Sequence, residues 1–184
     1  RRQRQMCIRD RLDFLIQSLV KLSRMESGII AVHSEDTTIK QMLESIQQQF
    51  NVKVREKNIT LSLCDTDLHI RCDSKWTVEA LGNIVDNAIK YTACGGNVQI
   101  KVEQYSFFVK IDIIDDGIGI EKEEIPKIFG RFYRSLSVAD QPGVGIGLFL
   151  AREIIQAQKG YIKVTSKRGK GSTFSVFLPI AKKE

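Results

Sequence analysis

Two kinds of hydrophobic repeat alternate along this chain of 184 residues, and their order limits the folds open to it. Residues 37–56 and 74–92 carry apolar side chains at helical spacing, whereas residues 98–104 and 107–114 read as the long strands of a hairpin. A turn signal at residues 95–97 stands ahead of that hairpin. Long helices that interleave with strands in this way favour an α+β fold.

Shorter segments complete the alternation. Helices that cover one face of a mainly antiparallel mixed sheet bury the apolar side of each element. We therefore predict a two-layer sandwich of this kind, preceded by one amphipathic helix. The further elements that we expect are strands at residues 29–32, 59–63 and 69–72, a short helix at 123–129, a helix at 145–158, and strands at 161–166 and 172–178.

An apolar stripe at residues 12–25 predicts the preceding helix, and Ser27 and Gly28 predict its end. A lone helix with such a stripe needs a partner, which is either the core of its own domain or a second copy of the chain. The division that we expect is an atypical segment at residues 1–10, this helix at 11–28 and one domain at 29–184.

The distribution of charge argues against a nucleic-acid partner. The net charge is +6, but residues 1–11 hold five arginines and one aspartate, or +4, which leaves +2 for the rest of the chain. A solvated basic segment on a nearly neutral domain explains this pattern better than a DNA-binding stripe does. A hydrophobic share of 42% and a charged share of 27% are typical of soluble globular proteins.

Cysteine usage and apolar runs bear on the setting of the protein. The four cysteines include no C-x-x-C pair and the chain has only two histidines, so neither a zinc site nor a disulfide framework is indicated. A reducing, cytosolic setting is therefore expected. No secretory signal is visible, and no apolar run approaches the roughly 18 residues that span a bilayer. We expect contact with a membrane only through segments upstream of this chain.

Three short motifs interrupt the hydrophobic repeats, two with polar side chains and one rich in glycine. Asn83 and Asn87 stand four residues apart on one face of an expected helix, where two amides on the apolar side are costly without a ligand. Asp115 ends an expected strand and begins Asp-Asp-Gly-Ile-Gly. The third motif, Gly-Val-Gly-Ile-Gly at residues 143–147, opens a helix, where backbone amides can face an anion.

In this order and spacing, the motifs resemble the ATP-binding domain of sensor histidine kinases, in the superfamily of gyrase, chaperone, kinase and MutL ATPases. The resemblance covers residues 12–179 and implies the Bergerat-type version of the sandwich. It implies ATP and Mg²⁺ as ligands, with Asn87 as the metal ligand, since magnesium prefers hard oxygen donors. Residues 11–28 resemble the second helix of a dimerisation hairpin, which favours a homodimer in the intact protein.

Roles for other side chains follow from the resemblance. Lys90 and Tyr91 match the pair that lies near phosphate and base, and Asp115 matches the carboxylate that accepts a hydrogen bond from the adenine amine. Arg134 is a candidate to neutralise charge at the γ-phosphate. Further nucleotide contacts are expected from Gly117, Gly119, Gly143, Gly145, Gly147, Leu148 and Thr173.

A polar segment at residues 135–143 resembles the mobile ATP lid of the family. Phe129 and Phe132 precede it and are expected to anchor the lid through hydrophobic contacts rather than to touch the ligand.

Asn83 favours a kinase over a hydrolase. Gyrase, MutL and the large heat-shock chaperone have a glutamate at the corresponding position as general base, whereas an amide cannot take a proton at neutral pH. Catalytic roles are therefore expected for Asn83, Lys90 and Arg134 in a protein-histidine kinase. A hydrolytic ATPase that uses Glu79, one turn earlier, remains an alternative, as does a non-catalytic dimerisation or interaction module.

The family's phosphoacceptor histidine has no counterpart in this sequence. His33 directly follows one expected strand and His69 begins another, whereas the acceptor belongs to a helix. We therefore expect the chain to bind nucleotide without labelling itself. In the intact protein, the resemblance implies transfer to a histidine and then to an aspartate of a response regulator, in the cytosolic portion of a membrane-bound sensor.

Overall fold

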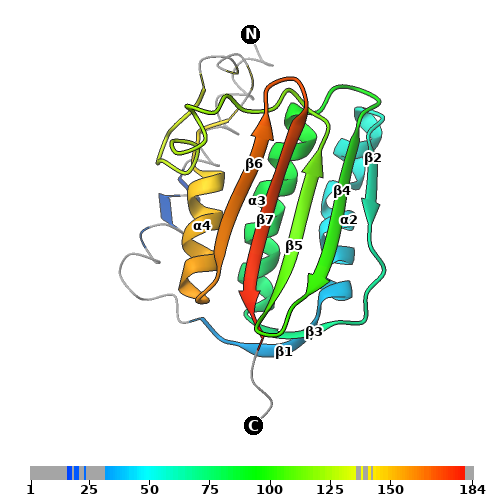
Figure 1. Ribbon diagram of the computed structural model, residues 1–184, viewed down its shortest axis with the longest axis vertical. Coiled ribbons are helices and arrows are strands. Elements are labelled where there is room, and N and C mark those ends of the chain that lie inside the picture. Colours follow the sequence, from blue (N-terminus) through cyan, green and yellow to red (C-terminus); the bar gives the residue numbers. More distant parts are fainter. Residues whose placement is uncertain are drawn as a thin grey trace.

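In the computed structural model, five strands form one sheet in the order β2-β4-β5-β7-β6, and helices α2, α3 and α4 cover one of its faces (Figure 1). β2 runs parallel to β4 and the other neighbours are antiparallel, so the predicted α+β sandwich is confirmed. The strands are β2 (Thr60–Leu63), β4 (Asn97–Gln104), β5 (Phe108–Asp115), β6 (Tyr161–Lys167) and β7 (Gly171–Pro179). The structure describes residues 16, 17, 19, 20, 23, 32–135, 138, 141 and 143–180.

A small second sheet joins the strand before α2 to the strand before α3. Its strands, β1 (Glu35–Thr38) and β3 (His69–Cys72), pair antiparallel. The sequence did not indicate β1, because its residues are polar and only pairing with β3 holds them extended. As a result α2 (Ile39–Glu56) begins at Ile39 rather than at residue 37, after Thr38, whose hydroxyl accepts the Gln41 N–H at 3.3 Å.

α3 (Ser74–Tyr91) lies between α2 and α4 (Gly147–Ala157) on the covered face of the sheet (Figure 1). It begins after Asp73, whose carboxylate accepts the Trp76 N–H at 3.0 Å. α4 begins at Gly147 rather than at the expected residue 145, and its N-cap residue, Ile146, makes no capping hydrogen bond through its side chain.

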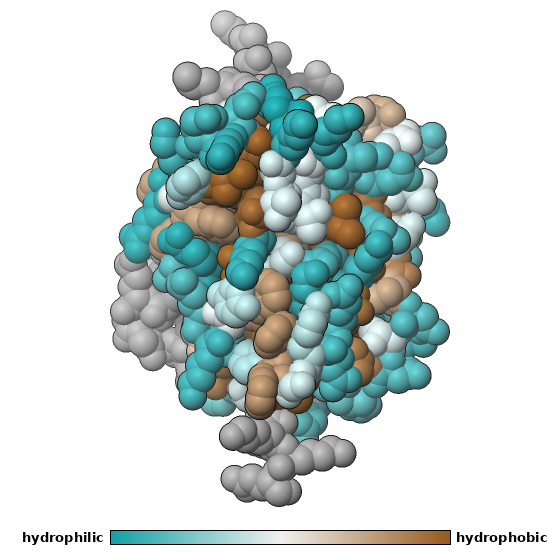
Figure 2. Space-filling model, viewed as in Figure 1, coloured by the Kyte–Doolittle hydropathy of each residue, from teal (hydrophilic) through white to brown (hydrophobic). Residues whose placement is uncertain are grey.

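The hydrophobic core fills the space between the helices and the sheet. Ile84 of α3 and Ile111 and Ile113 of β5 are all 0% exposed. The opposite face of the sheet is open, and Figure 2 shows that hydrophilic side chains predominate on it. The helices therefore bury one side of each strand, and the ends of the strands remain available for a site.

Some of the elements expected from the sequence differ from those in the structure, and others lie outside the described residues. The segment at residues 1–10, the helix at 12–25 and the strand at 29–32 lie wholly or largely outside the described residues. Residues 123–129 form hydrogen-bonded turns instead of a helix, because Pro126 has no N–H to continue a helical ladder. In the described part of the chain, no helix combines the length and the apolar composition that a membrane crossing needs.

Replacing Ile111 with alanine is expected to lower the free energy of unfolding by about 2–5 kcal/mol, because it leaves a cavity under the central strand. Val52→Ala is the control, since Val52 is 66% exposed and its truncation should cost less than about 0.5 kcal/mol. Urea unfolding followed by circular dichroism measures both. Equal losses in the two variants would contradict the place of Ile111 in the core.

Candidate functional site

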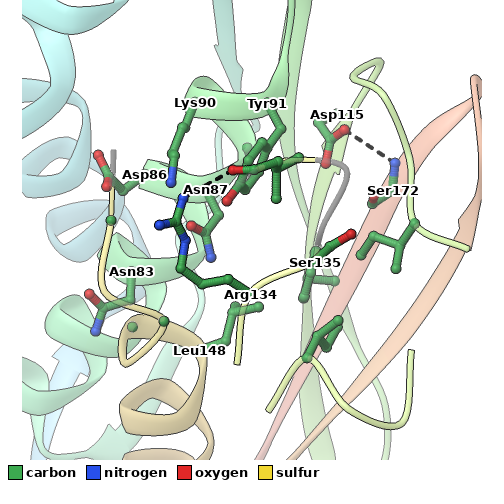
Figure 3. Close-up of a pocket in the computed structure, with 18 of the residues that line it drawn as sticks. Asn83, Asp86, Asn87, Lys90, Tyr91, Asp115, Arg134, Ser135, Leu148 and Ser172 are labelled. Atoms are coloured by element: carbon green, nitrogen blue, oxygen red, sulfur yellow. Dashed lines mark hydrogen bonds between the residues drawn. The ribbon is translucent and has the colours of Figure 1, made fainter. Parts of the chain in front are cut away.

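A cavity of about 410 Å³ lies between the C-terminal half of α3, the end of β5 and the start of α4. In Figure 3, Asn83, Asn87 and Lys90 lie on one side of it and Asp115 with Ser172 on the other. The structure therefore brings the three sequence motifs together around one space. The site residues expected from the sequence that line it are Asn83, Asn87, Lys90, Tyr91, Asp115, Gly119, Arg134, Gly143, Gly145, Gly147 and Leu148.

Asp115 stands at the end of β5 and is only 8% exposed. Its Oδ1 accepts the N–H of Gly117 at 2.9 Å and that of Ser172 at 3.2 Å. Burial raises the pKa of Asp115, and the two backbone hydrogen bonds act in the opposite direction. Both bonds use one oxygen, so Oδ2 has no hydrogen-bond partner among the described residues and can accept a donor from a ligand in the cavity.

The neighbouring Asp116 has a different task. Its carboxylate is exposed and accepts both the backbone N–H of Asn97, at 2.9 and 3.0 Å, and the Asn97 side-chain amide, at 2.8 Å. The backbone hydrogen bond from Asn97 lowers the pKa of Asp116. Asp116 thus fastens the turn before β4, and only Asp115 of the two lines the cavity.

Glycines let the loop after β5 run against other backbone. A Cβ at Gly119, whose φ is +66°, would lie 2.1 Å from the carbonyl oxygen of Lys167. A Cβ at Gly117 would lie 2.6 Å from that of Tyr91. Gly119 lines the cavity, whereas Gly117, also expected as a nucleotide contact, does not line it. Because its N–H is turned to Asp115, Gly117 acts by holding the carboxylate.

Thr173, expected as a ligand contact, does not line the cavity. Successive side chains of a strand point to opposite faces, and in β7 Ser172 and Phe174 line the cavity while Thr173 does not. The pairing of Thr173 with Ile114 and Thr165 places it in the sheet itself. The strand alternation, with the apolar Phe174 marking the inner face, is the signal that could have selected Ser172.

The start of α4 faces the two asparagine positions of α3. A Cβ at Gly147 would lie 3.5 Å from Oδ1 of Asn83, so the helix N-terminus passes close to this amide. Ile146 provides no side-chain cap, so among the described residues the first N–H groups of α4 have no capping side chain and can bind an anion. Among the described residues, Nδ2 of Asn83 is buried without a hydrogen-bond partner, and an oxygen atom of a ligand could satisfy it.

Two cationic side chains lie at the same side of the cavity. Lys90 Nζ lies 4.8 Å from the ring centroid of Tyr91, and a Cβ at Gly143 would come within 2.8 Å of it. Figure 3 shows the Arg134 guanidinium close to Asn87 and Lys90. Together with the α4 N-terminus, these groups make this side of the cavity suited to negative charge.

Arg134 also holds part of the expected lid. Its Nη2 donates to the carbonyl oxygens of Val138, at 3.0 Å, and of Gln141. Several lid residues lie outside the described part of the chain. Phe129 packs against the core, as an anchor should, whereas Phe132 is 53% exposed with a φ of +60°, contrary to the prediction that it anchors the lid.

Sequence reasoning missed the contribution of α2. Lys53 lines the cavity and its Nζ lies 2.6 Å from Oδ1 of Asp86 on α3. Both side chains are more than two-fifths exposed, so this ion pair contributes little to stability. No local motif marks residues of α2, because only the packing of α2 beside α3 brings them to the cavity. Glu79, one turn before Asn83, lines it as well.

Gly119→Ala is expected to be more destabilising than Gly169→Ala. Both glycines have a positive φ, +66° and +74°, so each alanine costs about 1–2 kcal/mol in backbone conformation. A Cβ at Gly169 has nothing within 4 Å, whereas the one at Gly119 meets the Lys167 carbonyl and should add about 1–3 kcal/mol. Urea unfolding compares the two, and equal losses would contradict the close approach.

Asp115→Asn is expected to stabilise the ligand-free protein at neutral pH. The pKa of Asp115 in the folded protein lies above the ordinary value of 3.8, so ionisation disfavours the folded state as pH rises. The side-chain oxygen of asparagine can accept the same two backbone bonds without charge. The gain should shrink toward zero as pH falls to about 3.8, grow as pH rises through the folded pKa, and then stay constant. Urea unfolding at a series of pH values tests this, and a gain independent of pH would contradict it.

Comparisons with known proteins agree with this geometry. Over 175 residues the chain is 33% identical to the sensor histidine kinase WalK of Bacillus subtilis (strain 168), covering 92% of this chain and 29% of the relative. The structure of this chain is similar to that of the Acinetobacter baumannii histidine kinase AdeS, with a TM-score of 0.78 and 25% identity. The match covers 93% of this chain and 79% of the AdeS chain. The chain spans less than half the length of the curated relatives that it matches.

The fold also resembles that of the histidine kinase ThkA in its complex with the response regulator protein TrrA, with a TM-score of 0.70, 22% identity, and coverage of 94% of this chain and 51% of that one. Residues 72–182, more than half of the chain, match the family model described as histidine kinase-, DNA gyrase B-, and HSP90-like ATPase. This segment contains all three sequence motifs of the cavity. The chain therefore belongs to the family of histidine kinase-, DNA gyrase B- and HSP90-like ATPases.

Proposed function

We propose that this chain is the ATP-binding catalytic module of a sensor histidine kinase. The observation that carries the proposal is the carboxylate of Asp115, whose Oδ1 accepts two backbone N–H groups and whose Oδ2 has no partner among the described residues and can accept a donor. The exocyclic amine of adenine is such a donor, whereas guanine carries a carbonyl oxygen at the equivalent position. Selectivity for ATP over GTP follows from this difference.

The opposite side of the cavity suits the phosphates of the nucleotide. Lys90, Arg134 and the uncapped start of α4 supply positive charge and free N–H groups. Among the described residues, no cluster of three or more His, Cys, Asp and Glu side chains could hold a metal ion. Asn87 would therefore hold Mg²⁺ jointly with phosphate oxygens and water, and the bound ion would neutralise phosphate charge.

Transfer rather than hydrolysis is supported by Asn83. Its amide cannot act as a general base on water, so the γ-phosphoryl group is kept for another acceptor. Neither His33 nor His69 lines the cavity, and the acceptor histidine would come from another part of the intact protein. Residues 11–28 would form its dimer, a response regulator would receive the phosphoryl group, and the module would lie on the cytosolic side of the parent sensor.

Saturable binding of Mg-ATP to the purified chain is expected in a calorimetric titration. Asn87→Ala and Asp115→Asn should each weaken binding by about tenfold or more, since each removes a hydrogen bond to a polar or charged ligand group. Asp115→Asn should also narrow the preference for ATP over GTP, because the asparagine amide can donate to guanine.

Two matched controls accompany these variants. Asn51→Ala makes the same change on the exposed side of α2, and Asp116→Asn makes it at the carboxylate next to Asp115. Both controls should bind as the parent chain does. No binding in the parent chain would overturn the proposal and favour a non-catalytic interaction module.

A hydrolytic ATPase is the second candidate, because Glu79 lines the same cavity one turn before Asn83. A carboxylate there could activate water. Steady release of inorganic phosphate that is abolished by Glu79→Gln but retained in Glu44→Gln, at an exposed position of α2, would favour this candidate over phosphoryl transfer.

A further inference from the structure

We infer that Lys57 is a positioning residue for the nucleotide site, which it shapes without lining the cavity; this inference rests on the proposed function. Lys57 follows the last residue of α2. Its Nζ donates to three backbone carbonyl oxygens at the end of α3, those of Ile89 at 2.8 Å, Lys90 at 3.0 Å and Thr92 at 2.6 Å. One ammonium group thus binds three carbonyls at the end of a helix that carries four of the expected site residues, Asn83, Asn87, Lys90 and Tyr91.

Two neighbouring carbonyls also have partners. Ala88 O accepts the N–H of Thr92 at 3.0 Å, and Tyr91 O accepts the N–H of Ile118 at 3.3 Å. The end of a helix normally leaves its last carbonyl groups without partners inside the helix. Here Lys57 takes the carbonyls on either side of Tyr91, so that the Tyr91 carbonyl remains directed at the loop that follows β5.

That loop begins directly after Asp115, the carboxylate proposed to select adenine. Ile118 lines the cavity, and Gly117 packs so closely on Tyr91 O that a Cβ would lie 2.6 Å from it. Gly117 in turn donates its N–H to Asp115 at 2.9 Å. A chain of contacts therefore runs from Lys57 through the end of α3 to the Asp115 carboxylate.

The backbone of Lys57 makes hydrogen bonds as well. Its carbonyl accepts the N–H of Gly95 at 3.0 Å, and its N–H donates within the last turn of α2. A positive charge at a helix C-terminus is favourable both for the exposed carbonyls and for the helix dipole. Because its backbone is bound to the last turn of α2 and to Gly95 while its ammonium binds the end of α3, Lys57 links α2 to the part of α3 that contacts the loop after β5.

A purely structural cap and a positioning residue differ in what their loss changes. Loss of a cap lowers stability, but binding by the molecules that remain folded is unchanged. Loss of a positioning residue also shifts Lys90, Tyr91 and the Ile118 N–H in the folded protein. Affinity for ATP below the melting temperature and amide exchange at Ile118 are therefore the informative measurements.

The test compares the variants Lys57→Met and Lys57→Arg with the parent chain. The control is Lys40→Met, which removes an exposed ammonium from α2. Mg-ATP affinity is measured by calorimetry well below each melting temperature, and amide exchange is measured without nucleotide. Lys57→Met should bind about tenfold more weakly and exchange the Ile118 amide faster. Lys57→Arg should be intermediate in both, and Lys40→Met should match the parent.

Parent-like affinity and parent-like Ile118 exchange in folded Lys57→Met would overturn the inference, whatever the change in melting temperature. If Lys57→Met does not fold, Lys57→Arg decides, and parent-like values for both measurements would overturn it. Failure of the parent chain to bind ATP would overturn the proposed function instead. In that case, faster Ile118 exchange in Lys57→Met would still support the claim that Lys57 positions the end of α3 and the loop after β5. Unchanged exchange would contradict that claim.

Discussion

The burial of the central strand β5 is the constraint on which the rest of the structure depends. β5 pairs with β4 on one side and β7 on the other, and Ile111 and Ile113 are fully buried on its helix-facing side. The same strand ends at Asp115. Because the core fixes the strand, it also fixes the carboxylate, and a ligand meets a group that is already oriented.

The polar groups of the cavity are held mainly by backbone atoms. Two N–H groups orient Asp115. The carbonyls at the end of α3 accept hydrogen bonds both from Lys57 and from the loop after β5. Burial of the Asp115 carboxylate raises its pKa and so costs stability at neutral pH. A donor from a ligand would offset that cost, so the feature that destabilises the empty protein is the one that favours binding.

Much of the fold could be predicted, because long amphipathic periods report burial directly. The prediction failed where local pattern and tertiary contact diverge. β1 is a polar segment made extended by β3, and residues 123–129 look helical until Pro126 interrupts the hydrogen bonds. At the site, the sequence did not indicate that Ser172, next to the expected contact Thr173, lines the cavity, because a motif does not by itself give the side of the strand that faces it.

The sequence by itself determined the order of helices and strands, the two asparagines on one helix face, the carboxylate before its glycines and the glycine cluster ahead of α4. These are local features, set by spacing along the chain. Only the tertiary structure decided that Ser172 and Lys53 reach the same cavity, that Oδ1 of Asp115 is occupied while Oδ2 is left for a ligand, and that Lys57 closes the end of α3. Such contacts join residues far apart in sequence, and no local pattern encodes them, because they form only when the helices pack on the sheet.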